Sequence, residues 1–173
     1  MNNFVLTKDN IFSEIECKDI INFCKNKTIE GDFNYLNYKC YDFPNSHFLF
    51  DRIKTLIQEY KTKYPEIDKT ASIWDLTSLR FKHFEPGKGY TDWHSEHCLS
   101  KPDRVLNVQI YLSNHNCGTE FFNNEVIQSK AGRVTFFPSY YTHTHKGQIC
   151  PDNKDRYIIT GYVTFIKKGP DED

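Results

Sequence analysis

The chain has little excess charge of either sign and no long apolar run. Its 173 residues include 22 Lys and Arg against 23 Asp and Glu, a net charge of -1, and no basic stripe stands out. Nucleic acid and anionic membrane surfaces are therefore not favoured as partners. No segment approaches the roughly 20 apolar residues of a membrane-spanning helix, and the first residues lack the pattern of an export signal. We expect a cytoplasmic protein that binds neither nucleic acid nor a membrane.

The sequence also lacks a C-x-x-C pair. Six cysteines are scattered along it: Cys17, Cys24, Cys40, Cys98, Cys117 and Cys150. An even number does not establish disulfides in a chain without an export signal, because disulfides are rare in reducing compartments. We therefore expect six free thiols.

The N-terminal part combines short extended segments with two helices. Residues 4–6 and 33–38 have strand patterns. Ser13 and Glu16 form a capping box that begins a helix ending near Lys25. Its apolar side comprises Ile15, Ile20, Phe23 and Cys24. A second helix follows Pro44 and should pack one face against a sheet, because its apolar residues recur at helical spacing. These residues are Leu49, Ile53, Leu56, Ile57, Tyr60 and Tyr64.

From Ile73 onward the apolar pattern has a period of 2, which predicts strands. The strand candidates are residues 78–85, 104–112, 119–122, 125–128, 133–137 and 156–166. Asn123 and Asn124 predict a hairpin turn, and residues 167–173 a frayed end. This order predicts an α+β, mainly β fold, in which N-terminal helices support a double-stranded β-helix, or jelly roll. We expect a single domain over 1–173, with helical support in 1–70 and the jelly-roll core in 71–168.

The segment YTDWHSEH carries a pair of metal-ligand types. His94 and Glu96 lie two residues apart, so they share a face if the segment is extended. A third ligand could come from THTHKG, about fifty residues later, which offers both His143 and His145. Two histidines and one carboxylate form a facial triad that holds Fe(II) and leaves the opposite positions open. His97 and Cys98, beside the pair, leave a zinc site as an alternative.

Five segments in order carry a family resemblance: YTDWHSEH, RVLNVQIYLS, CGTEFF, AGRVTFFPSYYTHTHKG and RYIITGYV. Over about residues 79–165 the chain resembles the iron- and 2-oxoglutarate-dependent oxygenases, and most of all their prolyl 4-hydroxylase-like branch. The resemblance implies that His94, Glu96 and His145 bind iron. It selects His145 over His143 because a basic residue and a glycine follow it. Glu96 stands where the family more often has Asp.

The resemblance also assigns the co-substrate site. Arg156 lies eleven residues after His145, where the family places the basic residue that binds the distal carboxylate of 2-oxoglutarate, and a guanidinium matches a carboxylate bidentately. Three hydroxyl side chains are further candidates to hold 2-oxoglutarate: Tyr90, Tyr111 and Thr119.

The implied activity is a dioxygenase that hydroxylates an unactivated C–H bond, in the first place of a prolyl residue in a peptide or protein. Its cofactors would be Fe(II), 2-oxoglutarate and O2, with ascorbate as a candidate reductant, and its co-products succinate and CO2. Tyr140 and Tyr141 could line a groove for an extended peptide. The alternatives are an oxygenase acting on a free amino acid or other small molecule, a non-catalytic cupin-like module that binds a small ligand, and a zinc-stabilised interaction domain.

Overall fold

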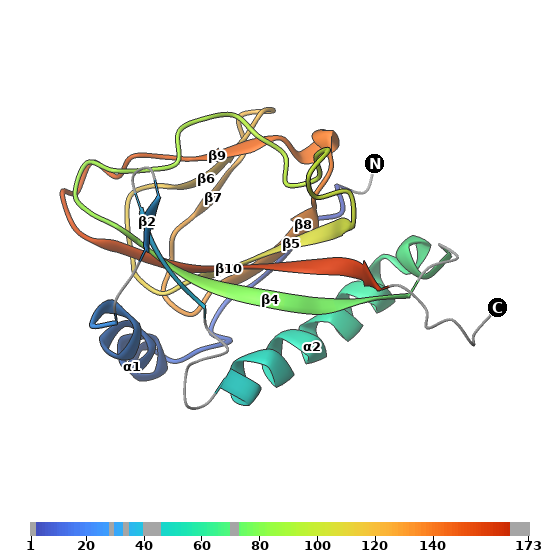
Figure 1. Cartoon of the computed structure of the whole chain (residues 1–173), viewed down its shortest axis with the longest axis horizontal. Coiled ribbons are helices and arrows are strands. Elements are labelled where there is room, and N and C mark those ends of the chain that lie inside the picture. Colours follow the sequence, from blue (N-terminus) through green and yellow to red (C-terminus); the bar gives the residue numbers. More distant parts are fainter. Residues whose placement is uncertain (1–2, 28–29, 33–34, 40–45, 70–72, 167–173) are drawn as a thin grey trace.

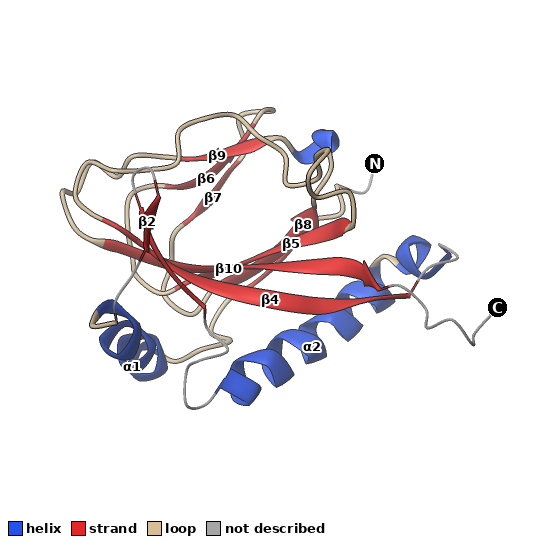
Figure 2. Cartoon of the chain, in the orientation of Figure 1, coloured by secondary structure: helices blue, strands red, loops and turns tan. Residues whose placement is uncertain are grey.

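The computed structural model describes residues 3–27, 30–32, 35–39, 46–69 and 73–166. Two antiparallel sheets face each other, and two helices cover the outer face of the larger one (Figure 1, Figure 2). The larger sheet has the order β1-β8-β5-β10-β4-β3-β2: Leu6–Lys8, Val134–Pro138, Arg104–Tyr111, Arg156–Ile166, Ile73–Phe84, Tyr35–Lys39 and Glu30–Asp32. The smaller has the order β7-β6-β9: Val126–Gln128, Gly118–Phe121 and His145–Gly147. The predicted mainly β, jelly-roll class is confirmed.

Helix α1, Glu14–Lys25, begins at the predicted capping box. The Ser13 hydroxyl accepts from the Glu16 amide at 3.2 Å, and the Glu16 carboxylate accepts from the Ser13 amide at 2.8 Å, so two backbone donors at the helix start are satisfied. The apolar face is only partly as predicted. Ile15 is 71% exposed, and Cys17 is buried in its place with Ile20 and Cys24.

Helix α2, Ser46–Lys63, packs its predicted apolar face on the larger sheet, and all six residues of that face are buried. A 3-10 turn, η2 (Pro65–Lys69), follows it. The Tyr60 and Tyr64 hydroxyls donate to the carbonyls of Phe4 and Val5 at 2.7 and 2.9 Å, which ties the N-terminal segment to the helix. None of the helices that the structure describes is long and apolar enough to cross a membrane.

Most strand predictions are confirmed to within a residue at each end. The exceptions are β4, which begins at Ile73 rather than Ser78, and β1, which lies two residues later than predicted. Asn124 adopts a φ of 67° in the predicted hairpin between β6 and β7. The elements that were not predicted are strands β2 and β9 and the 3-10 turns η2 and η3 (Tyr141–His143). Residues 33–34 and the tail 167–173 lie outside the described residues.

Alternation along the central strands gives the larger sheet two different faces. In β5, Leu106, Val108 and Ile110 join the core beneath the sheet, whereas Gln109 and Tyr111 line a cavity between the two sheets. Strands β4 and β10 alternate in the same way, because successive side chains point to opposite faces. One set of strands therefore supplies both the core and the walls of the cavity.

The prediction of six free thiols is wrong for two cysteines. Cys117, just before β6, forms a disulfide with Cys150, in the loop between β9 and β10, and their Cα atoms lie 5.0 Å apart. That spacing is in the normal range for a disulfide. The residues are 33 positions apart, and the fold alone brings them together. Cys17, Cys24 and Cys98 are free, and Cys40 lies outside the described residues.

Candidate active site

Three side chains from two segments of the chain converge in the cavity between the sheets. His94 lies in the loop between β4 and β5 and forms an isolated β-bridge with His145 on β9. Glu96 lies two residues after His94 in the same loop. The Nε2 atoms of His94 and His145 lie 3.6 and 3.9 Å from Oε1 of Glu96. All three ligand atoms are within 4.8 Å of one another. The predicted trio is therefore brought to one point.

Backbone contacts orient both imidazoles. The amide of each histidine donates to the carbonyl of the other, at 3.0 and 2.9 Å, which fixes the two chain segments side by side. Nδ1 of His94 bonds to the Asp92 carbonyl at 2.8 Å, and Nδ1 of His145 to the His143 carbonyl at 3.0 Å. Because a carbonyl can only accept, each Nδ1 carries the hydrogen, and each Nε2 offers its lone pair to the cavity.

The electrostatics of the trio favour metal-binding protonation states. Burial alone would raise the pKa of Glu96, but the contact with His94 and the charge of Lys82 outweigh it and lower that pKa to about 2. Burial, together with the neighbouring His94 ring, lowers the pKa of His145 to about 4. At neutral pH the site therefore offers a carboxylate and a neutral imidazole, as metal coordination requires.

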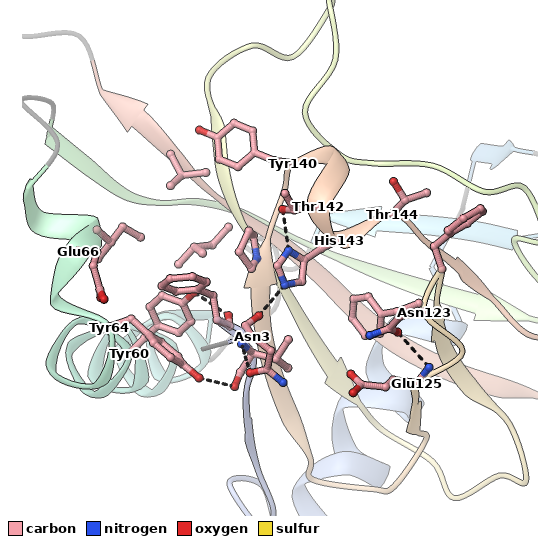
Figure 3. A pocket seen from close by; sticks show the side chains of 18 of the residues that line it. Asn3, Tyr60, Tyr64, Glu66, Asn123, Glu125, Tyr140, Thr142, His143 and Thr144 are labelled. Carbon is pink, nitrogen blue, oxygen red and sulfur yellow. Dashed lines mark hydrogen bonds between the residues drawn. The ribbon is translucent and has the colours of Figure 1, made fainter. Parts of the chain in front are cut away.

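His143, the competing histidine, points away from the trio. It lies on η3 and faces a second, mainly apolar cavity of about 610 Å³ (Figure 3). Its Nε2 bonds to the Asn3 carbonyl at 2.6 Å, and its Nδ1 to the Thr142 hydroxyl at 2.9 Å. Both ring nitrogens of His143 are thus hydrogen-bonded away from the trio. His145 is instead packed against Phe121 and Phe137, with ring centroids 6.0 and 4.8 Å away.

Arg156 lies buried in the cavity of the trio, which has a volume of about 210 Å³. Its guanidinium stacks over the Phe84 ring at 4.5 Å, and its Nη1 contacts the Cys117 sulfur at 3.7 Å. Its Nε and Nη2 have no hydrogen-bond partner within the described ranges. Burial lowers the pKa of this group, but an arginine stays charged in proteins. Two buried, unpaired donors indicate that an anionic group binds here.

The three predicted hydroxyl residues line the same cavity. The Tyr111 hydroxyl donates to the Thr119 oxygen at 2.8 Å or to Oε1 of Gln109 at 2.9 Å, and the Thr119 hydroxyl lies 2.6 Å from that same Oε1. Tyr90 packs its ring against His94, with 4.5 Å between centroids. The polar cluster beside Arg156 is therefore already ordered by its own hydrogen bonds.

The zinc alternative does not match the geometry. Among the described residues, the trio is the cluster of metal-ligand types at this cavity. Nδ1 of His97 instead lies 3.4 Å from the Arg104 carbonyl, and its ring contacts Tyr140 at 4.7 Å. The Cys98 thiol is exposed and contacts Ser100.

Comparison with known proteins places this arrangement in a family. Residues 79–164 match the model of the 2OG-Fe(II) oxygenase superfamily. The chain belongs to that superfamily. It is a 2-oxoglutarate-dependent dioxygenase, and its cofactors are Fe(II), 2-oxoglutarate and O2. No curated protein sequence matches the chain.

Solved structures share the oxygenase fold over nearly the whole chain. The viral collagen prolyl hydroxylase of Paramecium Bursaria Chlorella virus-1, in its 2OG complex, is 20% identical, with a TM-score of 0.73 and coverage of 95% of this chain and 97% of that one. A Pseudomonas putida prolyl-4-hydroxylase is 13% identical, with a TM-score of 0.68 and coverage of 97% and 95%. A Trichoplax adhaerens prolyl hydroxylase in complex with a hypoxia inducible factor peptide fragment is 12% identical, with a TM-score of 0.66 and coverage of 94% and 84%. At these identities the likeness shows the fold.

The oxygenase cofactors fit the residues present. Ligands that share one face of an octahedral ion lie about 3 Å apart, at bonds of about 2.1 Å. The trio is slightly wider than this, so small side-chain rotations would close it around Fe(II). The unpaired donors of Arg156 suit the distal carboxylate of 2-oxoglutarate. Glu96 has one methylene more than Asp, and its carboxylate still lies close to both histidines.

Sequence reasoning did not predict the roles that three further residues have at this site. Nη1 of Arg104 bonds to Oε2 of Glu96 at 2.7 Å, which leaves Oε1 directed at the histidines. Gln109 accepts from the hydroxyl cluster, and Lys82 lines the cavity and lowers the pKa of Glu96. Lys82 lies two positions after Arg80 on β4, and Gln109 lies two positions before Tyr111 on β5. Because residues two apart on a strand share a face, the alternating pattern could have assigned both to the face that lines the cavity.

Proposed function

We propose that this oxygenase hydroxylates prolyl residues in a peptide or protein. In the reaction, 2-oxoglutarate and O2 are converted to succinate and CO2, and one oxygen atom replaces a hydrogen of the substrate as a hydroxyl group. The observation that carries the proposal is the joint placement of His94, Glu96, His145 and Arg156 in one cavity, within a fold shared with prolyl hydroxylases.

The chain's own residues orient and shield the reactants. His94, Glu96 and His145 would hold Fe(II), which would activate O2, the oxidant of the reaction. Arg104 holds the outer oxygen of Glu96 in place. Arg156 would bind the distal carboxylate of 2-oxoglutarate, and the cluster of Tyr111, Thr119 and Gln109 lines the same cavity. Phe84 and Ile158 add apolar walls to it.

Exposed aromatic side chains beside the iron ligands support an extended substrate. Trp93, adjacent to His94, is 41% exposed and packs edge-on against Phe122, which is 70% exposed, with 5.2 Å between centroids. Aromatic-lined surfaces bind proline-rich peptides in several recognition domains. The Trichoplax prolyl hydroxylase binds a peptide fragment, which supports the same kind of substrate here. Tyr141 is also exposed, whereas Tyr140 packs on His97.

A free amino acid is the second candidate substrate. Two further basic residues, Arg80 and Lys82, line the cavity in addition to Arg104 and Arg156. They could bind the carboxylate of a small acid, a group that an internal prolyl residue lacks.

The test is mass spectrometry of candidate substrates after turnover. Purified enzyme would be incubated with Fe(II), 2-oxoglutarate, ascorbate and O2, and with a set of proline-rich peptides. The controls are the same peptides with alanine for proline, and free L-proline. We expect a gain of one oxygen in the proline peptides, matched by succinate. Oxidation of free proline with none of the peptides would favour the small-molecule alternative, and succinate without oxidation of either would reject both.

A further inference from the structure

A second cluster of metal-ligand types lies outside the iron site. It is formed by His115, in the loop after β5, and by Cys150 and Asp152, in the loop between β9 and β10. One ligand atom from each of the three lies within 4.8 Å of the others. His115 and Cys150 are buried, and none of the three lines the cavity that holds the iron trio. These three side chains therefore lie outside that cavity.

A hydrogen bond on each ring nitrogen fixes the orientation of His115. Its Nε2 lies 2.8 Å from the Ser113 hydroxyl, and its Nδ1 lies 2.8 Å from Oδ2 of Asp152. Because a carboxylate can only accept, Nδ1 donates to Asp152 in the metal-free structure, and the Ser113 hydroxyl donates to Nε2. If the ring hydrogen moves to Nε2, which then donates to Ser113, the Nδ1 lone pair becomes available to a metal. Metal-bound histidines are commonly oriented in this way by a partner on the second nitrogen.

Asp152 supplies an independent sign of a missing partner. Its Oδ1 is buried and has no hydrogen-bond partner among the residues that the structure describes. A buried carboxylate oxygen without a partner is costly. A cation bound by Asp152 would give this oxygen a partner.

Cys117, the disulfide partner of Cys150, is the candidate for a fourth donor. Imidazole nitrogen, thiolate sulfur and carboxylate oxygen are all zinc ligands, and structural zinc sites have four of them in a tetrahedron. A disulfide cannot bind zinc in this way, so the cluster has two exclusive states. The two sulfurs need only separate from about 2.0 Å in the disulfide to about 3.8 Å around zinc.

We propose that Cys117, Cys150, His115 and Asp152 form a zinc site when the disulfide is reduced. A dithiol reductant supplies two electrons and two protons to the sulfur pair and itself becomes a disulfide. The two thiols then lose their protons as Zn²⁺ binds both sulfurs. Reoxidation of the sulfur pair by a disulfide or peroxide oxidant releases the metal.

The experiment uses Co²⁺ as a spectroscopic probe of the intact protein. The protein would be reduced anaerobically with a phosphine, which takes up the two electrons and an oxygen atom from water, and then titrated with Co²⁺. Thiolate ligands give cobalt an intense near-ultraviolet charge-transfer band. The iron trio offers nitrogen and oxygen ligands, so Co²⁺ bound there lacks this band.

The expected result is a thiolate band that saturates near one Co²⁺ per chain, disappears when Zn²⁺ is added, and is absent from the oxidised protein. The band should be lost in Cys150→Ser and kept in Cys98→Ser, whose thiol is exposed and outside the cluster. No band in the reduced wild-type protein would overturn the proposal without relying on any variant. A band of unchanged intensity in Cys150→Ser would overturn it as well.

Discussion

At the scale of single residues, the two histidines of THTHKG have different environments although they lie two positions apart. His145 faces Glu96, whereas His143 bonds to Asn3 and Thr142. We predict that His145→Ala abolishes Fe(II) binding, because two protein ligands remain. His143→Ala should keep Fe(II) binding and lose about 1 kcal/mol of stability with its hydrogen bonds. Equilibrium dialysis with Fe(II) under nitrogen and thermal melts would measure both effects. Equal loss of iron in both variants would contradict the assignment of the ligand.

Arg156 provides a second test at this scale. We predict that Arg156→Met raises the KM for 2-oxoglutarate roughly 30-fold, since a charged hydrogen-bonded pair contributes about 2 kcal/mol. The matched control is Arg133→Met. Arg133 binds Asp9 at 2.7 Å outside the cavity, so its loss should leave this KM unchanged. Succinate formation at varied 2-oxoglutarate concentration gives the two values, and an unchanged KM in Arg156→Met would argue against its role.

At the scale of elements, α2 holds the larger sheet through side chains that have no exposure. Ile53 is fully buried in the core between the helix and the sheet. We predict that Ile53→Ala lowers the free energy of unfolding by about 2–4 kcal/mol, because it removes apolar contacts and leaves a cavity. For a chain of this size that corresponds to a fall in Tm of about 5–15 °C. The exposed Lys54→Ala is the control, and a similar shift in the two variants would show that the helix face is misassigned.

The edge strand β1 is fixed to its neighbours by a charge cluster. Asp9 binds Arg133 at 2.7 Å and Lys130 at 2.8 Å, and the hydrogen bonds from these residues lower the pKa of Asp9 below its ordinary 3.8. The folded state thus favours the ionised carboxylate, so the stabilisation is present above about pH 4 and is lost as the pH falls further. We predict that Asp9→Asn lowers the Tm by about 2–4 °C at pH 7, because a partly exposed pair contributes about 1 kcal/mol. Melts at pH 7 and pH 3 should show the difference shrinking in acid, and a constant difference would contradict this account.

The elements that could be predicted are those with a long local pattern. The capping box placed α1, six apolar residues at helical spacing placed α2, and alternation placed β10 at its observed ends. Strand β9 has three residues, which is too few for a period to show, and its pairing with β6 and His94 defines it. Ile15 follows the helical apolar pattern but is exposed, and Cys17 is buried instead. A local sequence pattern thus predicts where a helix or strand lies better than it predicts what that element packs against.

At the scale of the whole molecule, the site depends on contacts between distant segments. The residue types of the trio and of Arg156 could be predicted from their motifs, because each lies in a short, ordered signature. The pairing of Arg104 with Glu96 and the disulfide between Cys117 and Cys150 could not. Those contacts arise when β5, β9 and β10 are brought together by the two sheets, and no local sequence pattern encodes them.

The central claim is that one cavity holds Fe(II) through His94, Glu96 and His145 and 2-oxoglutarate through Arg156. Anaerobic visible absorption tests it most directly, because 2-oxoglutarate chelated to protein-bound Fe(II) gives a metal-to-ligand charge-transfer band. We predict that the band appears when both are added to the wild-type protein, is absent from His145→Ala, and needs more 2-oxoglutarate in Arg156→Met. A wild-type protein that shows no band at saturating Fe(II) and 2-oxoglutarate would contradict the account.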